Sequence, residues 1–155
     1  MRPLGLPEVE LLTLSRDSTM QLNPHLSFNG QCQKAFKFYQ QCLGGNIQTM
    51  MTHGDSPMAD QVPSEWRDKI LHATLIVGET ALMGADVPPD SYKEPRGFSI
   101  TIQINEPADA ERIFRALSEG GTVTMPLQET FWAARFGMVV DRFGIPWMVN
   151  CGQAA

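Results

Sequence analysis

The sequence predicts an α+β fold made of two copies of one unit, in which a strand, a helix and three strands follow each other (βαβββ). Segments whose apolar residues recur at every second position alternate with segments where they recur at every third or fourth position. The same order of elements occurs twice along the chain. With 155 residues, 43% of them hydrophobic, the chain fits one domain that has its own core.

The first unit is predicted over residues 20–87. Residues 23–28 alternate between apolar and polar side chains, as a half-buried strand does. A helix follows and ends at Gly44–Gly45. Its apolar positions fall on one stripe, formed by Cys32, Ala35, Phe36, Tyr39, Cys42 and Leu43. Glycine and proline predict a loop over residues 53–68. The other predicted strands are 47–52, 70–77 and 80–85, the last two joined by Gly78–Glu79.

The second unit is predicted over residues 96–152. Pro107 opens its helix, and Gly120–Gly121 ends it. The apolar stripe of this helix consists of Ala110, Ile113, Phe114 and Leu117. The predicted strands are 98–104, 122–127, 135–141 and 146–151.

An internal duplication explains this repeated order. When the chain is displaced so that Asn29 falls on Asn105, Phe38 falls on Phe114 and the glycine pair after the first helix falls on the pair after the second. Chance is the alternative, because few positions match and glycine ends many helices. The shared order of elements favours duplication.

Residues 1–19 match neither the periodicity nor the pattern of the rest of the chain. We interpret them as an N-terminal extension with no assigned function, and residues 20–155 as a single domain.

Charge and cysteine content exclude several classes of protein. The net charge of -5 would repel phosphate backbones, so we expect no nucleic-acid partner. The three cysteines are widely spaced and predict neither a disulfide framework nor a zinc site, which suits a cytoplasmic protein. No apolar run is long enough to span a membrane, and we expect no membrane partner.

Three segments carry a resemblance to a known family: NPHLSFNGQCQKAFKFYQQCLGG, GFSITIQINEPADAERIFRALSEGG and FGMVVDRFGIPW. The most specific pieces are the helix end FYQQCLGG and the motif of Asp141, Phe143, Gly144 and Trp147. The chain resembles the PhnB-like branch of the vicinal oxygen chelate superfamily, which includes glyoxalases, bleomycin resistance proteins and dioxygenases. The resemblance implies a U-shaped mixed or antiparallel sheet, with helices on its outer face and a ligand in its concave face. It does not choose among the activities of the superfamily.

Alternation within the strands predicts which side chains face that cavity. In three strands an apolar set alternates with a polar set, and the apolar set is expected to pack against the helices. The apolar set consists of Leu26, Phe28, Leu71, Ala73, Leu75, Phe98, Ile100 and Ile102. The polar set expected in the cavity contains His25, Ser27, His72, Thr74, Ser99, Thr101 and Gln103, with Leu82 and Met148 as apolar walls.

Metal-binding members of the resembled family place one ligand on the first strand and one on the last strand of each unit. The residues at those four positions are approximately His25, Leu82, Thr101 and Met148. Asp86 would add a carboxylate if the register of the strand that contains Leu82 shifted. One imidazole and one hydroxyl do not offset the dehydration of a divalent cation. We therefore predict no metal ligands and no cofactor, and a divalent metal is the less favoured alternative.

Several candidate residues have two interpretations. His25 is the one candidate catalytic residue, since an imidazole titrates near neutral pH. For both His25 and His72 the alternative is a neutral hydrogen-bonding role in the pocket. Trp132 either stacks on a ligand or packs, and Arg135 either binds an anion or forms a surface ion pair. The predicted ligand-binding set is His25, His72, Thr74, Asp86, Thr101, Gln103, Trp132 and Arg135.

Two functions of different class remain. The first is a metal-free protein that binds a small organic molecule, as a sequestering or resistance-type protein. The alternative is a small-molecule lyase, isomerase, transferase or dioxygenase-type enzyme that uses His25, with or without a divalent metal.

The sequence also predicts a homodimer. Curved sheets leave unpaired edges, which a second subunit usually covers in the resembled family. The loop over residues 50–63, rich in methionine and proline, and the aromatic pair Phe131–Trp132 are the expected contacts.

Overall fold

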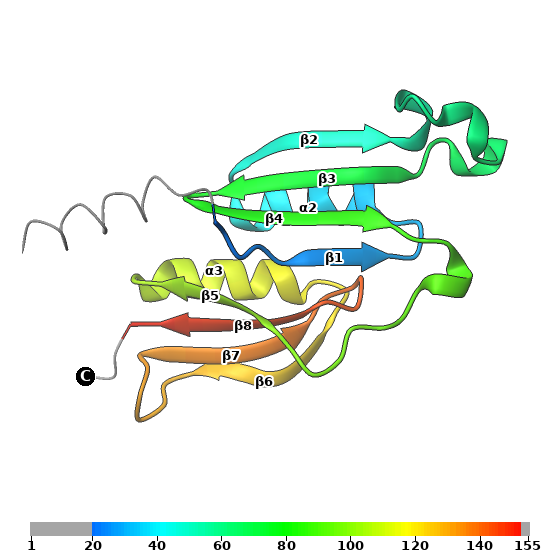
Figure 1. Ribbon diagram of the computed structural model, residues 1–155. Coiled ribbons are helices and arrows are strands. Elements are labelled where there is room, and N and C mark those ends of the chain that lie inside the picture. The colour runs from blue at the N-terminus through cyan, green and yellow to red at the C-terminus, as the bar shows by residue number, and fades with distance from the viewer. Residues whose placement is uncertain (1–19, 153–155) are drawn as a thin grey trace, which may run out of the picture.

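The structure is a computed structural model that describes residues 20–152, and it contains two units with the same order of elements (Figure 1). The predicted extension, residues 1–19, lies outside the described residues. The first unit consists of β1 (His25–Phe28), α2 (Cys32–Leu43), β2 (Asn46–Thr52), β3 (Ile70–Val77) and β4 (Thr80–Asp86). The second consists of β5 (Ile100–Ile104), α3 (Pro107–Ser118), β6 (Thr122–Gln128), β7 (Arg135–Val140) and β8 (Pro146–Cys151).

Each unit forms its own four-stranded mixed sheet. The strand orders are β1-β4-β3-β2 and β5-β8-β7-β6. In each sheet the first strand of the unit pairs with the last in parallel, while the other neighbours are antiparallel. The predicted α+β fold of two βαβββ units is therefore confirmed, with its eight strands divided between two sheets.

The helices bury the stripes that the sequence predicts. The buried side chains are Cys32, Ala35, Phe36, Tyr39 and Cys42 in α2, and Ala110, Ile113, Phe114 and Leu117 in α3. The spacing of these positions makes Phe36, rather than Phe38, the counterpart of Phe114. The predicted match of Phe38 with Phe114 is therefore wrong, because Phe38 lies half-buried beside Phe143, with ring centroids 5.7 Å apart. None of the helices described between residues 20 and 152 is long and apolar enough to cross a membrane.

Two glycines mark the face of each sheet that contacts its helix. A Cβ atom on Gly84 of β4 would lie 2.7 Å from Cε1 of Phe36, and one on Gly137 of β7 would lie 2.8 Å from Cε1 of Phe114. Only glycine permits these approaches without a shift of the neighbours. Alternate residues of β4 and β7 therefore face the helices, and the residues between them face away.

Two predictions about strand residues are wrong. Leu71 was expected on the helix-facing side of β3, but it is 38% exposed because a register shift between Met51 and Thr52 interrupts the pairing of β2 with β3. Phe98 was expected within a strand, but β5 begins at Ile100. The predicted loop over residues 53–68 contains three short 3-10 helices, His53–Asp55, Ala59–Gln61 and Ser64–Trp66.

A buried carboxylate joins the two units. Oδ2 of Asp141 accepts hydrogen bonds from the Tyr39 hydroxyl of α2 at 2.6 Å and from the Trp147 indole of β8 at 2.8 Å. Oδ1 accepts from the backbone N–H groups of Phe143 at 2.8 Å and Ile145 at 3.0 Å. The two most specific segments of the sequence, FYQQCLGG and the motif from Asp141 to Trp147, thus meet in one hydrogen-bonded cluster. Their role here is structural.

Candidate functional site

The face of each sheet that points away from its helix carries most of the predicted polar residues, and we call it the open face. Cross-strand pairing aligns His25, Met83, Thr74 and Thr49 in one row on the first sheet. The corresponding row on the second sheet contains Thr101, Met148, Met138 and Met125. The two open faces therefore differ, because methionines stand in the second row where threonines stand in the first.

A second row on the second sheet carries amides. Gln103 of β5 pairs with Asn150 of β8, Asn150 pairs with Phe136 of β7, and Phe136 pairs with Gln128 of β6. Trp132 packs against Phe136 with ring centroids 5.4 Å apart. The side-chain amide oxygen of Asn150, Oδ1, is buried and has no hydrogen-bond partner.

Two cavities adjoin β5. One of about 470 Å³ lies between the two units, and its lining includes Pro24 before β1, residues of β4 and four residues of β5. The lining residues with polar side chains are Thr80, Thr101 and Gln103, and the apolar ones include Leu82 and Ile102. Because Thr101 and Gln103 lie on the opposite face of β5 from Ile102, this cavity borders both faces of the edge strand. The second cavity, of about 340 Å³, is lined by Gln103, Ile104, Asn105, Trp132, Asn150 and Gly152. Gln103 thus lines both cavities.

Three predicted residues of the first sheet lie outside these two cavities. His25 is exposed on β1, and Thr74 is buried on β3. Nε2 of His72 lies 3.1 Å from Oγ1 of Thr74, which is hydrogen-bond distance. The structure therefore separates the predicted set into His25, His72 and Thr74 on one sheet and Thr101, Gln103 and Trp132 beside the cavities of the other.

Asp86 has no free carboxylate oxygen for a ligand in the cavities beside β5. Oδ1 accepts a hydrogen bond from the N–H of Cys32 at 2.9 Å, and Oδ2 accepts one from the N–H of Ile70 at 2.8 Å. Asp86 shares the helix-facing side of β4 with Gly84, and its charge lies at the first turn of α2, where it complements the helix dipole. No side chain caps this helix at Gln31, so Asp86 supplies the acceptor from a distant strand.

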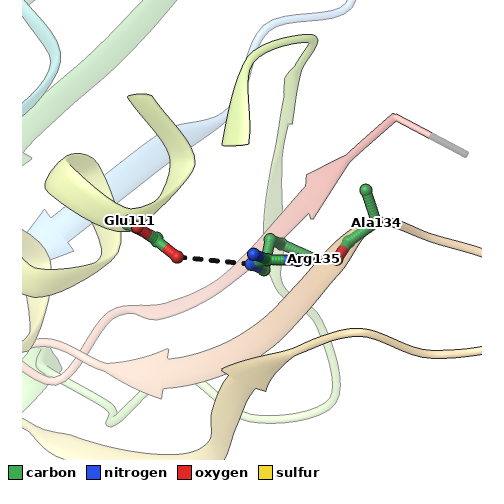
Figure 2. Close-up of polar contacts among 3 residues, drawn as sticks. All are labelled: Glu111, Ala134 and Arg135. Carbon is green, nitrogen blue, oxygen red and sulfur yellow. Dashed lines mark hydrogen bonds and ion pairs between the residues drawn. The ribbon is translucent and has the colours of Figure 1, made fainter. Parts of the chain in front are cut away.

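Arg135 also lies on the helix side of its sheet (Figure 2). Its Nε is 3.3 Å from Oε1 of Glu111 on α3, and its Nη1 donates to the carbonyl oxygen of Ala134 at 2.7 Å. Of the two interpretations of Arg135, the ion pair is the one present in the structure. The guanidinium is thus directed away from Thr101 and Gln103, which occupy the opposite face.

The three cysteines are free and buried. Burial, followed by the negative charge of Asp141, raises the pKa of the Cys42 thiol to about 11. Burial, followed by the charge of Asp86, raises the pKa of the Cys32 thiol further still. Because the thiolate is the nucleophile and the metal ligand, these thiols are inert at neutral pH.

Comparison with known proteins places this geometry in a family. Residues 21–149 match the Glyoxalase/Bleomycin resistance protein/Dioxygenase superfamily. The chain belongs to this superfamily. The resemblance stated from the sequence motifs is therefore confirmed at the level of the superfamily.

Three relatives show how closely other members match. The crystal structure of protein PA1353 from Pseudomonas aeruginosa is 51% identical, covers 88% of this chain and 100% of that one, and has a TM-score of 0.80. Protein YjdN from Escherichia coli K12 is 34% identical over 139 residues, which are 84% of this chain and 95% of YjdN. The PhnB protein from Bacillus cereus is 18% identical with a TM-score of 0.73, covers 86% of this chain and 100% of that one, and shares the fold.

The structure corrects the residue expected at one of the four positions where metal-binding members carry a ligand. Met83, not Leu82, occupies the open face of β4, because Met83 pairs with His25 while Leu82 pairs with Leu75 and packs in the core. The four places are therefore His25, Met83, Thr101 and Met148. One imidazole, one hydroxyl and two thioethers do not fit a divalent cation that prefers oxygen ligands. Among residues 20–152, no three His, Cys, Asp or Glu side chains gather where a metal ion could be held.

Sequence reasoning missed Asn150 and Phe136. A usable signal existed for Asn150, since Met148 was placed on the open face of β8 and residues two apart on a strand share a face. Phe136 gives no such signal, because an aromatic side chain on β7 fits the core equally well.

Proposed function

We propose that this protein binds a small organic molecule beside β5, between the two units, without a catalytic metal. The observation that carries the proposal is the cavity of about 470 Å³, whose walls are largely apolar and whose polar side chains are few. A mostly apolar pocket with a few polar groups is the usual form of a small-molecule site.

Thr101 and Gln103 are the groups expected to orient the molecule. They occupy the same face of β5, and neither side chain has a hydrogen-bond partner among the described residues. The third polar residue of the cavity, Thr80, already donates its hydroxyl proton to the carbonyl oxygen of Val77 at 2.7 Å. The ligand would therefore receive its polar contacts from β5 and its apolar contacts from β4 and Leu43.

A thermal-shift screen of metabolites and antibiotics tests this proposal. A compound present at 100 times its dissociation constant should stabilise the protein by about 2.7 kcal/mol. Thr101→Val and Gln103→Leu should each reduce that shift, because each removes one polar contact from the cavity. Gln128→Leu is the matched control, since Gln128 is an exposed amide on the same open face that lines neither cavity. If no compound stabilises the protein, or if stabilisation survives both β5 substitutions, the proposal fails.

The alternative is an enzyme that uses His25 for proton transfer. His25 is exposed on the open face of β1, and no side chain between residues 20 and 152 hydrogen-bonds to its imidazole. A general base is usually oriented by a partner, so the binding function is the better supported of the two. Elemental analysis of untagged protein purified without chelators separates the alternatives. Stoichiometric metal, or turnover that His25→Ala abolishes without loss of stability, would favour the enzyme.

We further propose that the protein acts as a homodimer in the cytoplasm. Three buried free thiols suit a reducing compartment. The apolar side chains exposed on the loop after β2 and on the loop between β6 and β7 suit a protein interface.

A further inference from the structure

A cavity beside α2 has a basic lining that the proposed function does not use. It has a volume of about 490 Å³, and its basic residues are Lys34 and Lys37 of α2 and Arg142 of the turn between β7 and β8. The rest of the lining is Gln31, Gln41, Phe38 and Phe143, so no carboxylate contributes to it. Because α2 belongs to the first unit and the turn belongs to the second, the cavity spans the junction of the two units.

The two lysines are placed side by side without a countercharge. Side chains three positions apart on a helix are neighbours, and like charges on neighbouring positions repel each other. Both lysines are exposed, and neither ammonium group forms an ion pair or a hydrogen bond with a residue between 20 and 152. The chain has a net charge of -5, so a shortage of carboxylates does not explain these unpaired cations.

Arg142 is held in place at the cavity. Its Nε donates to the carbonyl oxygen of Glu119 at 3.1 Å, and its Nη2 lies 3.2 Å from Oε1 of the same residue. Its Cζ lies 4.5 Å from the centroid of the Phe38 ring, a cation–π contact. These contacts use two of the five N–H donors of the guanidinium, so three donors remain for a ligand. The carboxylate of Glu119 offsets the charge of Arg142, and the excess positive charge comes from the two lysines.

We propose that this cavity binds a compact oxyanion with at least two negative charges, the common chemistry of phosphoryl compounds and polycarboxylates. Two ammonium groups without a countercharge match two negative charges, and a guanidinium with free donors suits phosphate or carboxylate oxygens. Because its ligands come from both units, the bound anion would hold α2 against the turn between β7 and β8. The site is independent of the proposed function, since none of its residues lines the cavities beside β5.

Pyrophosphate and citrate are the probes for this site, and acetate is the singly charged control. Titrations are made in metal-free buffer at neutral pH, with sodium chloride keeping the ionic strength constant. At least one of the two probes should bind saturably and should raise the melting temperature by about 3 °C or more at tenfold excess over its dissociation constant. The Nε–H signal of Arg142 and the backbone amide signals of Lys34 and Lys37 should move in ¹⁵N NMR spectra. Tighter binding of pyrophosphate would assign the site to phosphoryl compounds, and tighter binding of citrate would assign it to polycarboxylates.

A double variant separates binding from general charge effects. Lys34→Gln with Lys37→Gln should weaken binding by about tenfold or more, because it removes two charge-assisted contacts. Both side chains are exposed, so the anion-free variant should melt close to the wild type. Lys93→Gln is the matched control, since it removes the charge of an exposed lysine outside this cavity and should leave binding unchanged.

Three results would overturn the inference. The first is the absence of saturable binding of either probe up to about 10 mM. The second is an equal rise in melting temperature with acetate or sodium chloride at the same ionic strength, because the effect would then be screening of the net charge. The third is equal binding by the double variant and the wild type. None of these results bears on the cavities beside β5, so the proposed function is tested separately.

Discussion

At the scale of single residues, the two buried acidic side chains, Asp86 and Asp141, are structural. Each accepts hydrogen bonds from backbone N–H groups, and together they fix the start of α2, the start of β3 and the turn between β7 and β8. Buried carboxylates are expensive unless their oxygens are hydrogen-bonded, and in both residues each carboxylate oxygen accepts at least one hydrogen bond. Polar residues left unpaired beside a cavity, such as Thr101 and Gln103, are therefore the better candidates for binding.

Asp141→Asn should destabilise the protein by about 3–6 kcal/mol. The amide has one acceptor oxygen where the carboxylate has two, so its NH2 group must face either the Tyr39 hydroxyl and the Trp147 indole or the two backbone N–H groups, and two of the four donors lose their acceptor. Each such bond to a charged group contributes about 1.5–3 kcal/mol. Tyr39→Phe removes only one of the bonds and should cost correspondingly less. Urea unfolding measures both changes. As a control, the exposed Asp109→Asn should stay within about 0.5 kcal/mol. Equal stability of Asp141→Asn and the wild type would contradict the structural role.

The sequence identified part of the candidate site for a definite physical reason. Thr101 and Gln103 alternate with three isoleucines on a short strand, and only one face of that strand fits the core. Asp86 was included because a shift of the strand register would have added its carboxylate to the site. Its carboxylate instead binds two backbone N–H groups, one of which is distant in sequence. Arg135 likewise bonds to Glu111 from another element. The alternation of apolar and polar residues along one strand cannot reveal hydrogen-bond partners that lie on other elements.

At the scale of elements, close contact between helix and sheet depends on small residues at defined strand positions. Both helices were predicted from their apolar stripes, and the α2 bounds agree with the predicted stripe. The stripe does not show where the opposing sheet needs a glycine. Gly84 and Gly137 reveal this only in the folded structure, where they lie beneath Phe36 and Phe114.

Gly84→Ala should destabilise the protein by about 1–3 kcal/mol, the usual cost of an extra methyl group in a packed core. The added Cβ would lie 2.7 Å from Cε1 of Phe36 and 3.0 Å from the carbonyl oxygen of Leu26, so either the ring or the strand must shift. Thermal unfolding provides the measurement. In a Phe36→Leu background the ring is absent, and the same substitution should cost less. An equal cost in both backgrounds would show that the ring does not limit the space at Gly84.

At the scale of the whole molecule, the two units share a topology but differ on their open faces. The first sheet carries His25, Thr74 and Thr49 beside Met83, whereas the second carries three methionines and Thr101 in the equivalent row. Topology follows from hydrophobic periodicity, which both halves of the sequence retain, so it was predictable. The open faces do not pack against the helices, so they are freer to diverge, and sequence repetition does not predict them.

The last prediction is that the protein is a dimer in solution. The outer edges of the two sheets are formed by β2 and β6, and large apolar side chains lie exposed close to them, Met51 in β2 and Phe131 after β6. Phe131 is 90% exposed and packs edge-to-face against Trp132, with ring centroids 4.8 Å apart, so this loop presents an aromatic pair of the kind that is enriched at protein interfaces. Light scattering at micromolar concentration should give about twice the 17.2 kDa of one chain.

Phe131→Ser should then shift the mass toward that of a single chain, because it removes an aromatic anchor from the interface. Phe98→Ser is the matched control, since Phe98 is also exposed but precedes β5, the inner edge strand of the second sheet. Far-UV circular dichroism must show both variants folded. A wild-type mass of one chain that persists at high concentration would refute the dimer. A dimer that survives Phe131→Ser would move the interface away from the loop between β6 and β7, and the Met-rich loop after β2 would be the next segment to substitute.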